Sequence, residues 1–217
     1  MTQSLTIDQI ISNLIHSVVV GQAHLVVAVG LADSDPVVLA AAAVFFAMSI
    51  DSHLYSSQMH AARLHDRTRG AVTINSLLKR AEKEAGAAKY GTAEEVRESI
   101  ASSKARLSKL AVTLDALTTR RNTWLAHTDP EAISNPVKVA ELARVSFPDL
   151  QRVFAETGSI VNEFSRLFRD ITVVLELFGQ TDYQTVIEFV SEKKCEQFRQ
   201  YEAEFGPAPF PRPKGCK

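Results

Sequence analysis

The sequence predicts an all-α protein, a bundle of about five or six helices with two long central helices, and three observations support this fold class. Helix-start signals recur along the chain, since Thr6-x-x-Gln9, Thr92-x-x-Glu95 and Thr181-x-x-Gln184 each fit the capping box. Apolar residues repeat at steps of three and four, the spacing that keeps a stripe on one helix face. Strand signals are nearly absent, with no Asn-Gly or Asp-Gly hairpin.

Six helices are expected from these signals. Asp35 before Pro36 offers an N-cap followed by proline at the first helical position, and Ser146 can cap the helix after it. The predicted helices cover residues 7–29, 36–68, 73–88, 92–126, 147–178 and 183–204. The stretch 128–145 contains two prolines and is expected to be a connector.

Two of these helices contain long apolar stripes and are expected to pack against each other. The first stripe consists of Val96, Ile100, Ser103, Leu107, Leu110, Leu114 and Leu117. The second lies within 147–178 and includes Leu150, Val153, Phe154, Ile160, Val161, Phe164, Leu167, Phe168, Ile171, Val174 and Leu175. These two stripes predict the centre of the core.

Length and composition indicate one medium-sized globular domain. The 217 residues are 46% hydrophobic and 23% charged, which are ordinary values for a soluble protein. We expect a single helical domain over 1–205 and a flexible, proline-rich tail over 206–217. The two cysteines, Cys195 and Cys216, form no CxxC pair, which suits a reducing cytoplasm and excludes a disulfide framework.

Membrane, metal and nucleotide functions find little support. The uncharged stretch 9–32 is long enough to cross a bilayer but is interrupted by polar residues, and 36–50 is too short. We therefore expect a cytoplasmic protein with no membrane partner. His53 and His60 share a helical face without carboxylates in ligand register. No P-loop, GxGxxG or HExxH motif is present, and no metal or cofactor is expected.

The first apolar stripe, continued by one step, reaches Arg121. A guanidinium cannot lose its proton and is costly to bury unpaired, so Arg121 requires a partner or a water-lined cleft. The segment 63–127, which ends just beyond it at His127, holds 13 Lys/Arg against 7 Asp/Glu, a net charge of +6. Such an excess fits a polyanion-binding surface, although a solvated helix face has the same composition. Cations near a helix C-terminus are also favoured by the macrodipole alone.

Arg121-Asn122, four residues and then His127 resemble the signature of the HEPN superfamily, in which an arginine, a polar residue and a histidine end a long helix. The resemblance is closest to the AbiU-type branch associated with abortive phage infection. It extends over roughly residues 40–180, through Ala62-Arg63-Leu64-His65-Asp66-Arg67, Ser76-Leu77-Leu78, Leu125-Ala126-His127-Thr128-Asp129 and Phe147-Pro148-Asp149-Leu150.

This resemblance implies a HEPN-like bundle and a metal-independent endoribonuclease of the toxin or phage-defence type, acting on single-stranded RNA at a composite homodimer site. Arg121 would hold the scissile phosphate, His127 would transfer protons and Asn122 would orient them. Arg120, seven residues before His127, is a second candidate for substrate binding. The alternative is a non-catalytic HEPN-like dimer that binds RNA, nucleotide or a protein partner.

An antitoxin or other defence-system partner is a further expectation. In HEPN toxins that are paired with a nucleotidyltransferase antitoxin, the modified residue is a tyrosine two positions after the histidine. This sequence has Asp129 at that position, which argues against neutralisation by that route.

Overall fold

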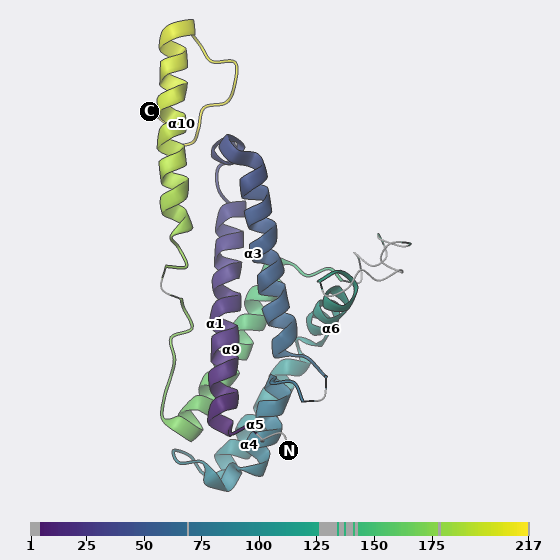
Figure 1. Ribbon diagram of the computed structural model, residues 1–217. Coiled ribbons are helices and arrows are strands. Elements are labelled where there is room, and N and C mark those ends of the chain that lie inside the picture. The colour runs from purple at the N-terminus through teal and green to yellow at the C-terminus, as the bar shows by residue number, and fades with distance from the viewer. Residues whose placement is uncertain are drawn as a thin grey trace. The chain divides into compact units, whose positions relative to one another are not determined.

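The computed structural model confirms the all-α class (Figure 1). It describes residues 5–216 except 69, 126–133, 135–136, 138–140, 142 and 178, and these described residues contain no strand. The helices are α1 (Ile7–Ala32), α2 (Pro36–Leu39), η1 (Ala40–Ala42), α3 (Ala43–Leu64), α4 (Ile74–Lys83), η2 (Ala85–Ala87), α5 (Ala93–Ser108), α6 (Ala111–Arg120), η3 (Arg121–Leu125), α9 (Phe147–Arg169) and α10 (Tyr183–Phe205).

Most helix starts follow the local signals in the sequence. Thr6, Thr92 and Ser146 each accept a hydrogen bond from the backbone N–H three residues later, and Asp35 caps α2 through the backbone N–H of Val37. Each cap satisfies a backbone donor that has no partner inside the helix. The helix after Thr181 differs, because it starts at Tyr183 without a side-chain cap.

The chain divides by its internal contacts into two compact units, and each is described by itself. Unit 1 comprises 1–23 and 55–177, and unit 2 comprises 24–54 and 178–217. The single domain expected over 1–205 and the flexible tail over 206–217 stay predictions.

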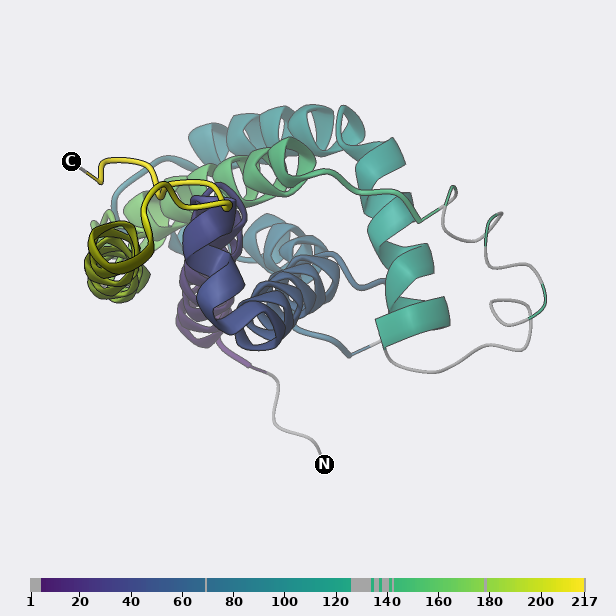
Figure 2. The same ribbon diagram turned by 90° about the horizontal axis from the view of Figure 1, so that it is seen from above.

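The core of unit 1 is formed where α4 and α5 pack on α9, and α5 and α9 lie side by side in Figure 2. Glycine at position 21 brings α1 close to α9, because a Cβ there would lie 2.6 Å from the ring of Phe154. The largest fully buried apolar side chains of unit 1 are Phe154, Phe164, Ile11, Leu14, Leu64, Ile74, Leu77, Leu117, Leu150 and Ile160.

The helix predicted over 92–126 is broken, and this corrects the sequence analysis. α5 ends at Ser108 and α6 starts at Ala111, with Leu110 buried between them. No Gly or Pro marks the break in the sequence. Arg106, near the end of α5, is held against α9 by Glu156 at 2.7 Å and Glu163 at 3.6 Å. Of the two parts, α5 packs on α9, and Figure 2 shows α6 turning away from the direction of α5.

The helix predicted over 147–178 also ends early, at Arg169, because Asp170 adopts a left-handed conformation with φ of 56°. The described residues after it have no helical conformation up to 177. The side chain of Asn162 bonds both the N–H and the C=O of Val173, at 3.0 and 2.9 Å. Leu175 packs over Gly158, since a Cβ added to Gly158 would lie 2.3 Å from a methyl group of Leu175. Tertiary contacts therefore hold the segment 171–177 against α9.

Unit 2 contains α2, η1 and α10, together with parts of α1 and α3. α10 packs on α2. Tyr183 lies so close to Gly30 that a Cβ added to Gly30 would overlap the hydroxyl of Tyr183. Three large apolar side chains of α3, Val44, Phe45 and Met48, are exposed.

By length and hydropathy, Ile7–Ala32 and Pro36–Leu64 could each cross a membrane. This is weak evidence for a membrane protein, because core helices of soluble proteins pass the same test.

Candidate functional site

The Arg-Asn motif lies where α6 changes into the wider π-helical turn η3. Thr118 and Thr123 donate their hydroxyl hydrogens to the carbonyls four residues earlier, at 2.8 and 2.7 Å. Such back-bonding weakens and bends helices, and π-helical turns recur at functional sites. The local sequence therefore favours an irregular turn where Arg121 begins.

Arg121 is held by a half-buried ion pair. Its Nη1 lies 2.6 Å from Oδ2 of Asp66, and the two side chains are 19% and 20% exposed. Its Nε donates to Oδ1 of Asn122 at 3.0 Å. A guanidinium has five N–H donors in a fixed fork, and these two contacts among the described residues orient Arg121.

Asp66 is in turn anchored in the loop that follows α3. Its Oδ1 accepts hydrogen bonds from the backbone N–H and the hydroxyl of Thr68, at 2.9 and 2.7 Å. Burial opposes ionisation of Asp66, but these bonds and the bond and charge of Arg121 outweigh it and lower the pKa of the carboxyl. The next residue, Arg67, pairs with Asp115 of α6 at 2.9 Å on the exposed surface. Two ion pairs thus join this loop to the segment that contains the motif.

Arg120 is the second cation of the motif. It is half-buried, and its buried Nε has no hydrogen-bond partner among the described residues. Burial lowers the pKa of its guanidinium, which nevertheless stays charged at neutral pH. Asp66 balances the charge of Arg121, and Arg120 adds a second positive charge to this turn.

His65 precedes Asp66 but is part of the packing. Its Nε2 lies 2.9 Å from the Thr157 hydroxyl of α9, and both residues are buried. Burial lowers the pKa of His65 to about 4. It is therefore neutral at pH 7 and is not positioned to exchange protons with a solvent-exposed substrate.

The structure brings together part of the predicted site. Arg120, Arg121 and Asn122 lie in one turn, whereas His127 and Asp129 lie outside the described residues. Asp66 is the functional candidate that sequence reasoning missed. The sequence did indicate that Arg121 requires a partner, because it continues an apolar stripe. Nothing in the local sequence shows that this partner is residue 66. Among the described residues, no group of three or more His, Cys, Asp or Glu could hold a metal ion.

The all-helical fold and the Arg-Asn pair at the end of α6 agree with the HEPN class, which a family model shows. The family model HEPN_AbiU2, described as AbiU2, matches residues 37–190, more than half of the chain, and the chain belongs to this family. No curated protein matches the chain, and no solved structure matches it.

Proposed function

We propose that the protein is a metal-independent endoribonuclease of the abortive-infection type, which cleaves single-stranded RNA at a composite site on a two-fold dimer. The proposal includes Arg121, His127 and Asn122 as the catalytic group and Arg120 as a substrate-binding residue. It also includes a cytoplasmic location and an antitoxin or other defence-system partner. Membership of the AbiU2 family supports this class of activity.

The reaction needs no metal if the side chains meet three requirements. A base takes the 2′-hydroxyl proton, the 2′-oxygen bonds to phosphorus, and the bond from phosphorus to the 5′-oxygen breaks as an acid protonates the leaving oxygen. Histidine can serve as acid or base near neutrality. Arginine stays charged and its planar fork matches phosphate oxygens. The products are a 2′,3′-cyclic phosphate and a free 5′-hydroxyl.

The observation that carries the proposal is the orientation of Arg121 by Asp66 and Asn122. Preorganised donors stabilise developing charge better than mobile ones, because they need not reorient during the reaction. A 2.6 Å charged contact and a 3.0 Å hydrogen bond fix the guanidinium plane. The adjacent Arg120, with an unpartnered Nε among the described residues, adds positive charge for the phosphodiester backbone.

A dimer would complete the site. One Arg–His pair supplies few groups for both acid and base roles, and a two-fold interface presents the same surface twice. Two motifs that face one cleft would provide two histidines and at least two arginines.

The second candidate function is a HEPN-like dimer that binds RNA, nucleotide or a protein without cutting. It is favoured by the same ion pair, because Asp66 already balances the charge of Arg121 and competes with a phosphate for it. In this function Arg121 is retained for packing or binding.

The test is cleavage of a single-stranded RNA in EDTA, with analysis of the ends. We expect cyclic-phosphate ends from the wild type and none from Arg121→Ala or His127→Ala, while both variants keep their helical circular dichroism. Arg67→Ala is the matched control, since it removes a neighbouring arginine that is paired with an acid but 72% exposed. It should cleave like the wild type.

Each other outcome points elsewhere. If the wild type never forms cyclic-phosphate ends and His127→Ala only weakens RNA binding, the binding function replaces the nuclease. Activity that appears only with added divalent metal would mean that the residue assignments are wrong. Light scattering tests the predicted dimer separately. A monomer at micromolar concentration would contradict the composite site.

A further inference from the structure

Residues 206–216 of unit 2 run back along α10 (Figure 1), and several of them make specific contacts with it. The ring of Phe210 packs edge-on against Phe198 and Tyr201, with centroids 5.7 and 5.1 Å apart. The guanidinium of Arg212 lies 5.0 Å from the centre of the Phe198 ring and pairs with Glu202 at 3.0 Å. These contacts set the register of residues 206–216 on the helix.

A backbone hydrogen bond closer to the C-terminus holds the chain in the same position. The N–H of Lys214 donates to the carboxylate of Asp35, at 2.6 Å. Pro213 is buried beside it. The contacts of Phe210, Arg212 and Lys214 therefore hold the chain up to two residues before Cys216.

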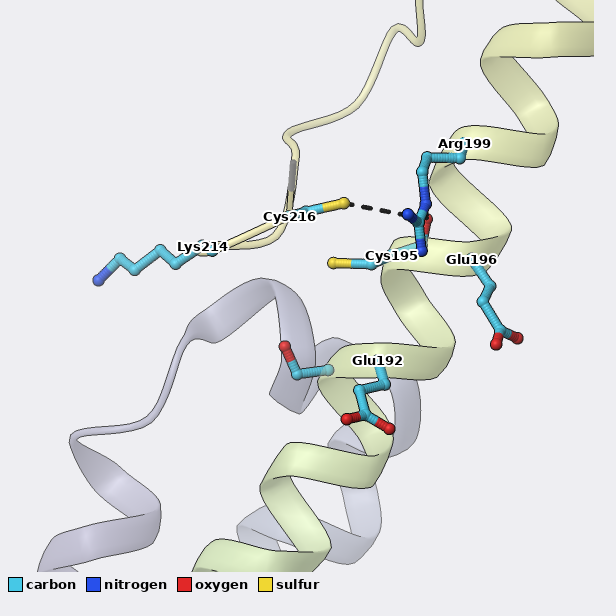
Figure 3. A pocket seen from close by; sticks show the side chains of 8 residues that line it. Glu192, Cys195, Glu196, Arg199, Lys214 and Cys216 are labelled. Atoms are coloured by element: carbon cyan, nitrogen blue, oxygen red, sulfur yellow. Dashed lines mark hydrogen bonds between the residues drawn. The ribbon is translucent and has the colours of Figure 1, made fainter.

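The docked register places Cys216 against Cys195. Sγ of Cys216 lies 3.9 Å from the backbone carbonyl oxygen of Cys195, a distance at which a thiol can donate a weak hydrogen bond. Figure 3 shows both sulfur atoms in one surface hollow, which is lined also by Glu192, Arg199 and Lys214. Both thiols are free and half-buried.

We propose that Cys195 and Cys216 form a reversible intrachain disulfide, which locks the C-terminal residues onto α10 when the cell is exposed to a peroxide. Both cysteines lie outside the matched residues 37–190, so this site does not depend on the proposed nuclease. A metal site is not supported, because the described residues include no group of three or more ligands.

The reaction is balanced with hydrogen peroxide as the oxidant. One thiol attacks the peroxide oxygen and becomes a sulfenic acid, with release of one water. The second thiol attacks that sulfur, the S–O bond breaks, and a second water leaves as the S–S bond forms. Two thiols are oxidised by two electrons in total, and the peroxide is reduced to water.

The environment of Cys195 disfavours it as the first thiol to be oxidised. Desolvation, followed by the nearby Cys216 thiol, raises the pKa of Cys195. A thiol with a raised pKa forms little thiolate at neutral pH and reacts slowly with peroxide. Cys216 is therefore the expected first site of oxidation, and Cys195 closes the disulfide.

The experiment uses the full chain. The protein is exposed to hydrogen peroxide, blocked with N-ethylmaleimide and digested with trypsin under non-reducing conditions. Cleavage after Lys194, Arg199 and Lys214 would release Cys195–Arg199 joined to Gly215–Lys217, a species that mass spectrometry identifies directly. We expect it to form about tenfold faster, or more, in the native protein than in guanidinium, because docking raises the effective concentration of the thiols.

Phe210→Ala is the matched variant, since it keeps both thiols but removes the aromatic contacts that set the register. It should slow formation of the linked peptide toward the rate in guanidinium. Equal rates for native and denatured protein, an unchanged rate in Phe210→Ala, or disulfides only between chains would each overturn the proposal.

Discussion

The ion pair between Asp66 and Arg121 should contribute measurably to folding stability, whereas the neighbouring pair between Arg67 and Asp115 should not. The two pairs have similar lengths, 2.6 and 2.9 Å, but very different exposure. The side chains of the first pair are 19% and 20% exposed, and those of the second are 72% and 62% exposed. Solvent screens an exposed pair, so that it contributes about 0–1 kcal/mol.

The magnitude for the shielded pair follows from its partial burial. A hydrogen bond to a charged group contributes about 1.5–3 kcal/mol, and the remaining exposure of both groups reduces this. We expect a coupling free energy of about 1–2 kcal/mol between Asp66 and Arg121, against about 0.5 kcal/mol or less between Arg67 and Asp115.

Two double-mutant cycles measure these coupling energies. The first uses Asp66→Asn and Arg121→Met. Asparagine can still accept the two bonds from Thr68 through its Oδ1, but it presents an amide to the arginine. The second cycle uses Asp115→Asn and Arg67→Met. Urea unfolding followed by circular dichroism gives each free energy of unfolding, and 1–2 kcal/mol corresponds to a midpoint shift of roughly 0.5–1 M.

The coupling should also depend on pH. The folded-state pKa of Asp66 is lowered relative to its ordinary value. Its contribution is therefore fully present above the unfolded pKa of about 3.9 and is lost as pH falls through the lower folded value. A coupling energy at pH 7 no larger than that of the exposed pair would refute the argument that burial strengthens this contact.

Three further predictions concern packing in unit 1. Burial lowers the pKa of His65 to about 4 in the folded protein, so folding favours its neutral form. The free energy of unfolding should therefore fall by about 3 kcal/mol as pH falls from 6.5 to 4, because protonation of His65 favours the unfolded chain. Urea unfolding of the wild type and of His65→Gln measures this loss. Gly21→Ala should destabilise unit 1 by about 1–3 kcal/mol, because the added Cβ would overlap the ring of Phe154, as thermal unfolding would show. Asn162→Ala should release the Val173 amide, which hydrogen exchange would detect as loss of protection.

Each of these has its own control. His65→Gln should be less sensitive to acid than the wild type, and equal sensitivity would assign the loss to other groups. Gly86→Ala places its Cβ in open space and should leave stability nearly unchanged, so an equal effect at both glycines would contradict the packing argument. Unchanged exchange at Val173 in Asn162→Ala would show that other contacts hold that segment.

Several features could be predicted from the sequence because they depend on residues within one helical turn. The capping boxes at Thr6, Thr92 and Ser146 and the cap at Asp35 join residues two or three positions apart. Their hydrogen bonds form whenever the chain is helical there. The all-α class and most helix starts follow from such local signals.

The ends of the long helices were decided by distant parts of the chain. α5 stops at Ser108 although no Gly or Pro follows, and Arg106 there is anchored to Glu156 of α9. α9 stops at Arg169, where helical spacing continues in the sequence, and Asn162 holds the non-helical segment at Val173. Periodicity shows which residues can share a face, but it does not show where a helix must stop to let another segment pack.

The candidate site divides in the same way. The sequence by itself determined that Arg121, Asn122 and Arg120 share one turn, and that an arginine on an apolar seam needs a partner. Only the tertiary structure showed that Asp66, 55 residues earlier, is that partner. The physical reason is that an ion pair forms only when tertiary packing brings two distant segments together. The local sequence determines the turn at each segment, but it does not determine which segments come into contact.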